Sequence, residues 1–364
     1  MNRDAFSARL ARIRPADAAA MDAARRRQAQ LAKPPGSLGE LEAISIRLAG
    51  ITGSVCNEIE RTRIYVLAAD NGVVAEGVSS APQSVTRQQA INLTRGVTGA
   101  SAIAQHFGDE LVVVDVGIAQ DYTCPQIVNR RIARGTKNIA KEPAMTVQQA
   151  LTALDTGMTL AAQAGRDGVQ ALGVGEMGIG NTTTSAAVLA ALTGCAAEDA
   201  VGRGGGVTDE ALARKRAVVA GALAQWKPDA NDPVDVLAKV GGFDLAAMTG
   251  VFLGAAERRL PVVIDGFISV VAALCAVRLC PAAREFLFAS HGSFERGYAV
   301  AAQALSLTPV LTLGMRLGEG SGCPLGFRVL EAACAAMNGM ATFDEARIDD
   351  GYLAPIRAQD AFTV

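Results

Sequence analysis

The sequence predicts an α/β fold, with a doubly wound, mostly parallel sheet similar to a Rossmann fold and a small helical domain built from both chain ends. Five short runs rich in β-branched residues each end in Gly, Asp or Ser and are followed by Ala-rich helical patterns. These runs are almost continuously apolar, which is typical of strands buried on both faces of a parallel sheet. They cover residues 63–72, 111–118, 169–180, 261–267 and 285–293.

The two ends of the chain depart from this alternation. Residues 1–62 are helical in pattern, apart from a break at the KPPG turn, and the sequence again predicts helix after Gly322. We therefore expect residues 1–62 and 322–364 to form a small helical domain. It would pack beside an α/β domain of residues 63–321, whose polar and glycine residues follow the strands, where ligands bind in such folds.

The composition restricts the classes of protein to which the chain can belong. Its 364 residues, 50% hydrophobic and 19% charged, are enough to bury a large core without disulfides or a structural metal. A net charge of −2 and 4% aromatic residues provide neither the basic surface nor the stacking side chains of a nucleic-acid-binding protein. Since His106 and His291 lie far apart and show no metal-ligand spacing, no metal site is expected.

Cysteine usage and hydropathy predict a cytoplasmic protein. The seven cysteines are odd in number and include no CxxC pair, which is typical of reduced thiols inside the cell. The first residues carry charges every few positions and show no apolar signal segment. The longest apolar run, 261–279, contains Asp265 and Arg278, so it predicts a buried strand and helix instead of a membrane span.

The segment GVGEMGIGNTTT, residues 173–184, is the densest candidate site. It follows a predicted strand and opens a predicted helix, so its free N–H groups and the helix dipole can cradle an anion such as a phosphate. Its glycines also satisfy GxGxxG, which leaves a dinucleotide site open, as well as a simple tight turn. The dinucleotide alternative is weakened because no predicted strand precedes Glu198 and Asp199, the acids at the required offset.

Three further segments carry candidate functional residues. Lys215 follows a second glycine cluster and is expected on an exposed helix face, where it can bind a phosphate or simply belong to a solvated basic face. Glu319, among the glycines of LGEGSG, can act as a base or accept from a ligand N–H, or it can merely begin a helix. Ser290 and His291 follow a strand, where they can contact a ligand or hydrogen-bond within the loop.

Ten segments, taken in order, resemble the nicotinate-nucleotide–dimethylbenzimidazole phosphoribosyltransferase family. No single segment is decisive, but together they span almost the whole chain. They are KPPGSLGELE, AADNGVVAEGVSSAPQSVT, NLTRGVTGASAI, VVDVGI, GTKNIAKEPAMT, GEMGIGNTTT, VGGFDLAAMTG, VIDGFIS, FASHGSFERG and LGEGSG.

The resemblance implies transfer of ribose 5-phosphate from nicotinate mononucleotide to 5,6-dimethylbenzimidazole or a related base. The products would be nicotinate and α-ribazole 5′-phosphate, used for the lower ligand of cobalamin. It implies a homodimer, no cofactor, and a larger domain that binds nucleotide and base. Family positions imply that Glu319 is the general base and that Glu176 and Lys215 lie near the ribose and phosphate. They imply that loops with Gly178, Gly205, Asp265 and Gly266 contact the nucleotide. The pocket for the acceptor base would be lined by Ser80, Gln88 and Leu317.

This chemistry accounts for what the sequence lacks. Nicotinate leaves from a positively charged pyridinium, so neither a general acid nor a metal is needed, and attack from the opposite face gives inversion at C1′. The chain departs from the family at Asn71, where many members have His, at Gln89, where Met is common, and at Cys323-Pro324. These departures are expected near the base pocket and leave base selectivity open. Two other functions also stay open: a non-catalytic partner subunit of a mixed dimer, and an NAD(P)-dependent oxidoreductase.

Overall fold

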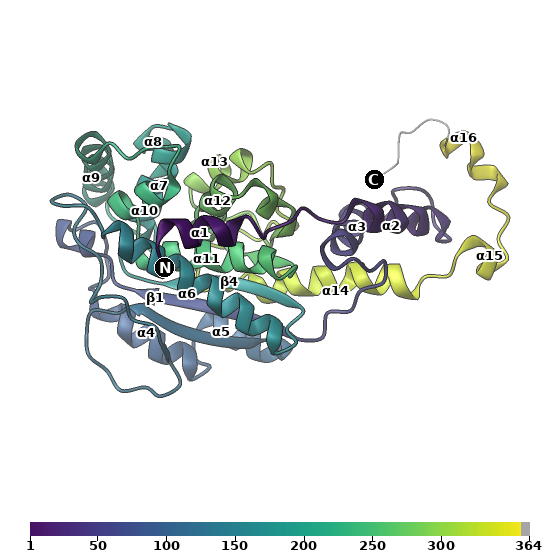
Figure 1. Ribbon diagram of the computed structural model, residues 1–364, viewed down its shortest axis with the longest axis horizontal. Helices are drawn as coiled ribbons and strands as arrows, with labels where there is room; N and C mark the ends of the chain where they lie inside the picture. Colours follow the sequence, from purple (N-terminus) through teal and green to yellow (C-terminus); the bar gives the residue numbers. More distant parts are fainter. Residues whose placement is uncertain (358–364) are drawn as a thin grey trace.

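The computed structural model describes residues 1–357 and contains one six-stranded sheet (Figure 1). Its strands run in the order β3-β2-β1-β4-β5-β6, and all neighbouring pairs are parallel. This is the doubly wound order, in which the direction of winding reverses between β1 and β4. The predicted fold class is therefore confirmed. The strands are β1 Thr62–Ala69, β2 Glu110–Gly117, β3 Val128–Asn129, β4 Ala171–Met177, β5 Val262–Ile264 and β6 Leu287–Ala289.

Each of the five predicted runs contains a strand, and the structure adds one that the sequence did not predict. The additional strand, β3, has only two residues and pairs at the edge of the sheet with β2. A two-residue strand has no periodicity to detect. The last run is mostly not a strand, because the 3₁₀ helix Pro281–Phe286 precedes a β6 of three residues.

Helices cover both faces of the sheet. The helices α6, α11 and α12 pack on one face, and α4, α5 and α14 on the other, while α7–α10 and α13 pack outside α11 and α12 (Figure 1). Both α11 and α12 are buried along nearly their whole length, which explains their almost wholly apolar sequences. The bounds are α4 Ser84–Thr94, α5 Gly99–Phe107, α6 Val147–Arg166, α7 Asn181–Thr193, α8 Ala197–Ala200, α9 Asp209–Trp226, α10 Pro233–Val240, α11 Phe243–Glu257, α12 Phe267–Leu279, α13 Gly297–Ala304 and α14 Cys323–Gly339; a 3₁₀ helix covers Gly72–Glu76.

Segments from the two chain ends lie side by side away from the sheet (Figure 1). There α2 packs on α3, α3 packs on α14, and an isolated bridge joins Leu31 to Thr342. Helix α1 instead contacts α6, and its Phe6 is part of the main core. The division into two domains stays a prediction. The bounds are α1 Arg3–Leu10, α2 Ala18–Gln30, α3 Glu40–Thr52, α15 Phe343–Ala346, the 3₁₀ helix Gly351–Leu353 and α16 Ala354–Arg357.

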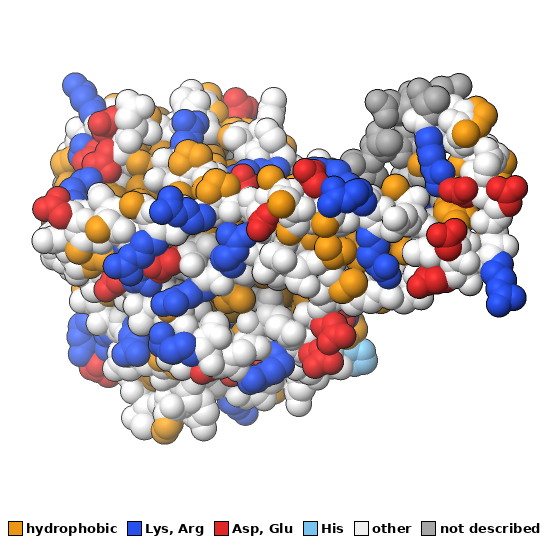
Figure 2. All heavy atoms as spheres, turned by 45° about the vertical axis from the view of Figure 1, so that its right-hand side comes forward, with side chains coloured by type: hydrophobic (Ala, Val, Ile, Leu, Met, Phe, Trp, Pro, Cys, Tyr) orange, Lys and Arg blue, Asp and Glu red, His pale blue; other side chains and the backbone are white. Residues whose placement is uncertain are grey.

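The surface carries both signs of charge. Figure 2 shows Lys and Arg side chains interspersed with Asp and Glu over the face in view, in keeping with the net charge of −2. No helix within residues 1–357 is long and apolar enough to cross a membrane. Nor does this part of the chain bring three or more His, Cys, Asp or Glu side chains together where they could hold a metal ion.

Candidate active site

A cavity opens beyond the carboxyl ends of β4, β5 and β6, where the sequence predicts the site. It brings together eight of the predicted site residues: Glu176, Gly178, Gly205, Asp265, Gly266, His291, Leu317 and Glu319. These come from five segments far apart in the sequence, which meet only because parallel strands end at the same edge of the sheet. The lining is completed by other side chains, among them Asn181, Thr182, Ser293, Glu295 and Arg316.

The loop that carries Glu319 has an unusual backbone. Gly318, Glu319 and Gly320 have φ angles of 81°, 62° and 82°, so all three lie in the left-handed region. A non-glycine residue is uncommon there and persists where the surroundings hold it. The buried carboxylate of Asp265 holds this loop by accepting hydrogen bonds from the backbone N–H groups of Gly320, at 3.0 Å, and Gly322, at 2.7 Å.

Close approach to β4 also fixes the loop. A Cβ atom on Gly175 would lie 2.4 Å from the backbone nitrogen of Gly320, and one on Gly173 would lie 2.7 Å from Cβ of Cys323. Two of the three GxGxxG glycines, Gly173 and Gly175, therefore lie within β4. Because they have no side chain, the Glu319 loop and the start of α14 can pack closely on the strand, and these glycines do not form a turn around a pyrophosphate. The dinucleotide interpretation of this motif is not supported.

The Glu319 carboxylate is well placed to accept a proton from a ligand. Its side chain lines the cavity although the residue is only 6% exposed. The Gln89 side-chain amide donates to Oε1 at 2.8 Å. The second oxygen, Oε2, is buried and has no hydrogen-bond partner within residues 1–357. Since buried carboxylate oxygens normally accept hydrogen bonds, this acceptor is available to a donor that enters the cavity.

Behind Glu319 lies a buried cluster of carboxyl and amide groups. Asn181 donates to Glu176 Oε2, and Asn71 donates to Asp244 Oδ2 at 3.4 Å. Burial, reinforced by Asp244, raises the pKa of Glu176 to about 8, and burial raises the pKa of Asp244 to about 6. At neutral pH Glu176 is therefore largely protonated and can donate a hydrogen bond.

Replacing Glu176 with Gln should stabilise the protein increasingly as pH rises from 4.5 to 8. The folded pKa of Glu176 is raised to about 8 from an ordinary value of 4.5. The wild-type protein therefore loses stability across this window, because the unfolded chain ionises first. The neutral amide removes that loss, which is on the order of 4 kcal/mol at pH 8. Urea unfolding at pH 5 and pH 8 measures the free energy of unfolding of both proteins. If the variant differs from the wild type by the same amount at both pH values, the prediction is contradicted.

Lys215 lies in a different environment from the one the sequence predicts. The residue is only 1% exposed, not on an open helix face. The chain folds Lys215 inward because Nζ donates to Thr182 Oγ1 at 2.7 Å and to the Gly202 carbonyl at 3.3 Å. Burial lowers the pKa of Lys215 to about 8. No carboxylate within residues 1–357 lies within 4.0 Å of Nζ, so an ammonium group is available beside the cavity-lining Thr182 and Gly205.

Ser290 and His291 follow β6 but differ in where they face. His291 lines the cavity, and burial lowers its pKa. The Ser290 hydroxyl lies 3.0 Å from His291 Nδ1 and 2.7 Å from the carbonyl oxygen of Ile264. Ser290 is therefore placed to orient His291 and does not line this cavity.

The predicted base-pocket residues are only partly brought to the cavity. Leu317 reaches its rim and is 55% exposed, whereas Ser80 and Gln88 are exposed and outside the lining. Gln89, the next residue on α4, contacts Glu319 instead. Asn71 is wholly buried behind Gly178, where it accepts from Thr184. This departure from the family therefore lies in the carboxyl cluster, and its position beside the base pocket stays a prediction.

Several lining residues were not among the predicted site residues. Asn181 and Thr182 lie in the GVGEMGIGNTTT segment but are not N-caps, since the N-cap of α7 is Gly180, which makes no side-chain bond. Both side chains instead face other polar groups of the site. Arg316 precedes LGEGSG and Asp244 lies in VGGFDLAAMTG, so proximity to those segments was the available signal.

A doubly wound sheet with a cavity at the carboxyl ends of its strands, lined by a buried carboxylate and lying beside a lysine ammonium group, is typical of enzymes that bind small anionic ligands such as nucleotides. A family described as phosphoribosyltransferase matches residues 13–348. The enzyme named nicotinate-nucleotide–dimethylbenzimidazole phosphoribosyltransferase in Clostridium perfringens is 51% identical over 341 residues, 94% of each chain. The enzyme of that name in Acetivibrio thermocellus is 49% identical over 329 residues, 90% of this chain and 94% of the relative.

A solved structure extends the comparison to the fold. The crystal structure of CobT from Thermus thermophilus superposes with a TM-score of 0.88 at 44% identity, and covers 92% of this chain and 100% of its own. The chain therefore belongs to the nicotinate-nucleotide–dimethylbenzimidazole phosphoribosyltransferase family and is a pentosyltransferase. This membership favours group transfer over the hydride transfer that the GxGxxG motif left open.

Proposed function

We propose that this enzyme transfers the ribose 5-phosphate group of nicotinate mononucleotide to 5,6-dimethylbenzimidazole or a related base. The products are nicotinate and α-ribazole 5′-phosphate, for assembly of the lower ligand of cobalamin. One observation carries the proposal: Glu319 lines the cavity with one oxygen fixed by Gln89 and the other without a partner in the described part of the chain. The reaction named for its relatives requires a base of this kind.

In the proposed reaction Glu319 is the general base. The unprotonated ring nitrogen of the base attacks C1′, and the C1′–N bond to the pyridinium breaks. Its electron pair returns to the pyridine ring, which neutralises that ring without a general acid. The proton on the other nitrogen of the attacking base passes to the Glu319 carboxylate. Attack opposite the leaving group inverts C1′ and gives the α product.

The nucleotide phosphate is proposed to bind between Lys215, the Gly204–Gly205 turn and the first turn of α7. Lys215 Nζ and the Thr182 hydroxyl already form a hydrogen bond beside this turn. The N–H groups of Asn181 and Thr183 in the first turn of α7 donate to the carbonyl oxygens of Gly178 and Gly180, but no described side chain caps the helix, and its dipole favours negative charge. The ribose would then lie toward Glu176, with Gly178 and Gly266 permitting close approach.

Replacing Asp265 with Asn should lower the turnover number about 10-fold by loosening the Glu319 loop. Each carboxylate oxygen of Asp265 accepts a hydrogen bond from one backbone N–H group, of Gly320 or Gly322. The asparagine amide has only one oxygen, so one of these buried N–H groups loses its acceptor. Steady-state kinetics with nicotinate mononucleotide measure the effect, and the KM for that substrate should change little. Asp4→Asn, an exposed charge loss on α1, is the matched control. A turnover number equal to wild type would show that Asp265 does not position the loop.

The reaction itself can be tested directly. Purified protein, nicotinate mononucleotide and dimethylbenzimidazole should yield nicotinate and α-ribazole 5′-phosphate without added metal, as measured by mass spectrometry. Offering several benzimidazoles, adenine and phenol together identifies the preferred acceptor. Nucleotide binding without turnover on any acceptor would instead support the non-catalytic partner subunit.

We also propose that the enzyme is a homodimer, as the family resemblance implies. Phe294, Leu313 and the cavity-lining Leu317 are large apolar side chains that stay exposed, at 76%, 54% and 55%. Burying them against a second copy would remove apolar surface from water. Light scattering of the purified chain should give twice the mass of 37.5 kDa, whereas 37.5 kDa alone would contradict the dimer.

A further inference from the structure

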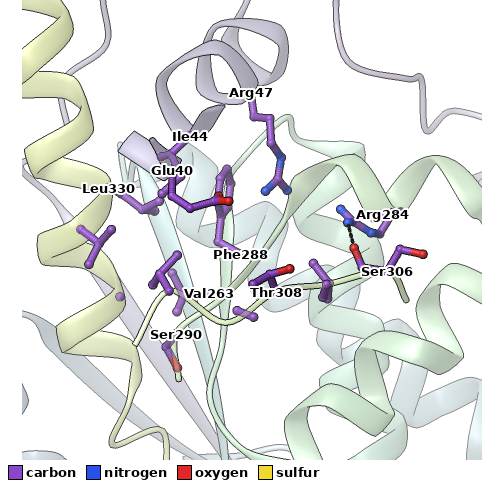
Figure 3. A pocket seen from close by; sticks show the side chains of 15 residues that line it. Glu40, Ile44, Arg47, Val263, Arg284, Phe288, Ser290, Ser306, Thr308 and Leu330 are labelled. Atoms are coloured by element: carbon purple, nitrogen blue, oxygen red, sulfur yellow. Dashed lines mark hydrogen bonds between the residues drawn. The ribbon is translucent and has the colours of Figure 1, made fainter. Parts of the chain in front are cut away.

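A second cavity, separate from the one beside Glu319, lies between α3, α14 and the end of β6 (Figure 3). Its volume is about 200 Å³, similar to the about 190 Å³ of the cavity beside Glu319. Ser290 lines this cavity, while His291 lines the other. Its lining combines the charged side chains of Glu40, Arg47 and Arg284 with mostly apolar side chains and the exposed Thr308.

Two arginines face this cavity with part of their hydrogen-bonding capacity unused. Arg47 donates through Nη2 to the carbonyl oxygens of Glu285 and Leu287, and its guanidinium lies 4.1 Å from the centre of the Phe288 ring. Arg284 donates through Nε and Nη2 to backbone carbonyls, each at 2.6 Å. The structure of residues 1–357 gives no acceptor for Nε and Nη1 of Arg47 or for Nη1 of Arg284.

Among the described residues, the two arginines form no close ion pair, although the carboxylates of Glu40 and Glu285 act on Arg47, and that of Glu285 on Arg284, from a greater distance. No ion pair within 4.0 Å forms on Arg47 or Arg284 in the described part of the chain. Burial and the neighbouring Arg284 lower the pKa of Arg47 to about 10, which still leaves it charged at neutral pH. Figure 3 shows both guanidinium groups pointing toward the centre of the cavity from different sides. Two cations held in this way favour an anion between them.

The remaining lining restricts the kind of anion. Ile44, Val263 and Leu330 form an apolar wall opposite the arginines (Figure 3). Glu40 also faces the cavity, so the three charged side chains sum to +1 and a dianion would be repelled by this carboxylate. We propose that this cavity binds a small organic monoanion, a carboxylate with an apolar body. The carboxylate would pair with Arg47 and Arg284, and its apolar part would pack on the opposite wall.

Benzoate is a suitable probe because it combines a carboxylate with an apolar ring. Calorimetric titration of the full chain at low salt should show one saturable site per chain. Benzamide, the neutral analogue, should bind at least 10-fold more weakly. Arg47→Met should weaken benzoate binding at least 10-fold. Arg14→Met removes the same charge from an exposed residue, so it serves as the control and should have no effect. Thr308→Trp, which fills the cavity from an exposed position, should also abolish binding and does not disturb the buried contacts of Arg47.

The location of bound benzoate decides the proposal independently of the transferase activity. Lys215→Met alters only the cavity beside Glu319, so it should leave benzoate binding unchanged. The proposal is overturned if wild-type protein shows no saturable binding, or if binding is lost in Lys215→Met but kept in both Arg47→Met and Thr308→Trp. Tighter binding of inorganic phosphate than of benzoate would overturn the assignment to a carboxylate.

Discussion

Replacing Glu319 with Gln is expected to lower the turnover number by about 10²–10⁴-fold, which corresponds to roughly 3–5 kcal/mol of activation free energy. The amide cannot accept the proton that leaves the attacking base. Its oxygen can still accept from Gln89, as Oε1 does now at 2.8 Å, so the loop geometry should be kept. Nicotinate release measures turnover, and calorimetry should show nicotinate mononucleotide binding within about 2-fold of wild type.

Gln89→Ala provides the matched comparison for Glu319. It removes the hydrogen bond that orients the carboxylate but keeps the base itself, so turnover should fall only about 10-fold. Wild-type turnover in Glu319→Gln would remove this residue from the mechanism. A parallel loss of nucleotide affinity would show that Glu319 acts in binding instead.

The fold could be predicted because its signals are local. Five apolar runs and the helices that follow them report burial on both faces, and each run contains a strand. The two-residue β3 could not be found, since edge pairing with β2 depends on tertiary contacts. The burial of Lys215 also depends on tertiary contacts. Its neighbours along α9 are charged, which is typical of an exposed helix face, and only the hydrogen bond to Thr182 shows that this lysine points inward.

The site was predicted at the level of segments but not of individual side chains. Gln88 and Gln89 are neighbours on α4, where successive residues point about 100° apart, so only one of them can face the cavity. The sequence does not specify which, because both are polar. Asp265 was assigned to nucleotide contact, yet its carboxylate is used by two backbone N–H groups of the Glu319 loop. A contact between segments 55 residues apart leaves no local pattern.

Replacing Lys215 with Met is expected to lower kcat/KM for nicotinate mononucleotide by about 10–10²-fold, mainly through KM. A hydrogen bond to a charged group typically contributes about 1.5–3 kcal/mol, and the buried methionine fills similar space without the charge. The pKa of Lys215 is lowered to about 8 in the free protein. Wild-type kcat/KM should therefore decrease as pH rises through 8, where the free enzyme loses the protons of both Lys215 and Glu176. The decrease should be smaller in the variant, in which only Glu176 titrates in this range.

The nucleoside nicotinate riboside separates phosphate binding by Lys215 from a general structural effect. It lacks the phosphate, so wild-type protein and Lys215→Met should use it with the same, low kcat/KM. The coupling between removing the lysine and removing the phosphate then measures their interaction directly. If Lys215→Met impairs both substrates equally, the lysine supports the fold of the glycine turn beside Thr182, and the phosphate must bind elsewhere along the cavity.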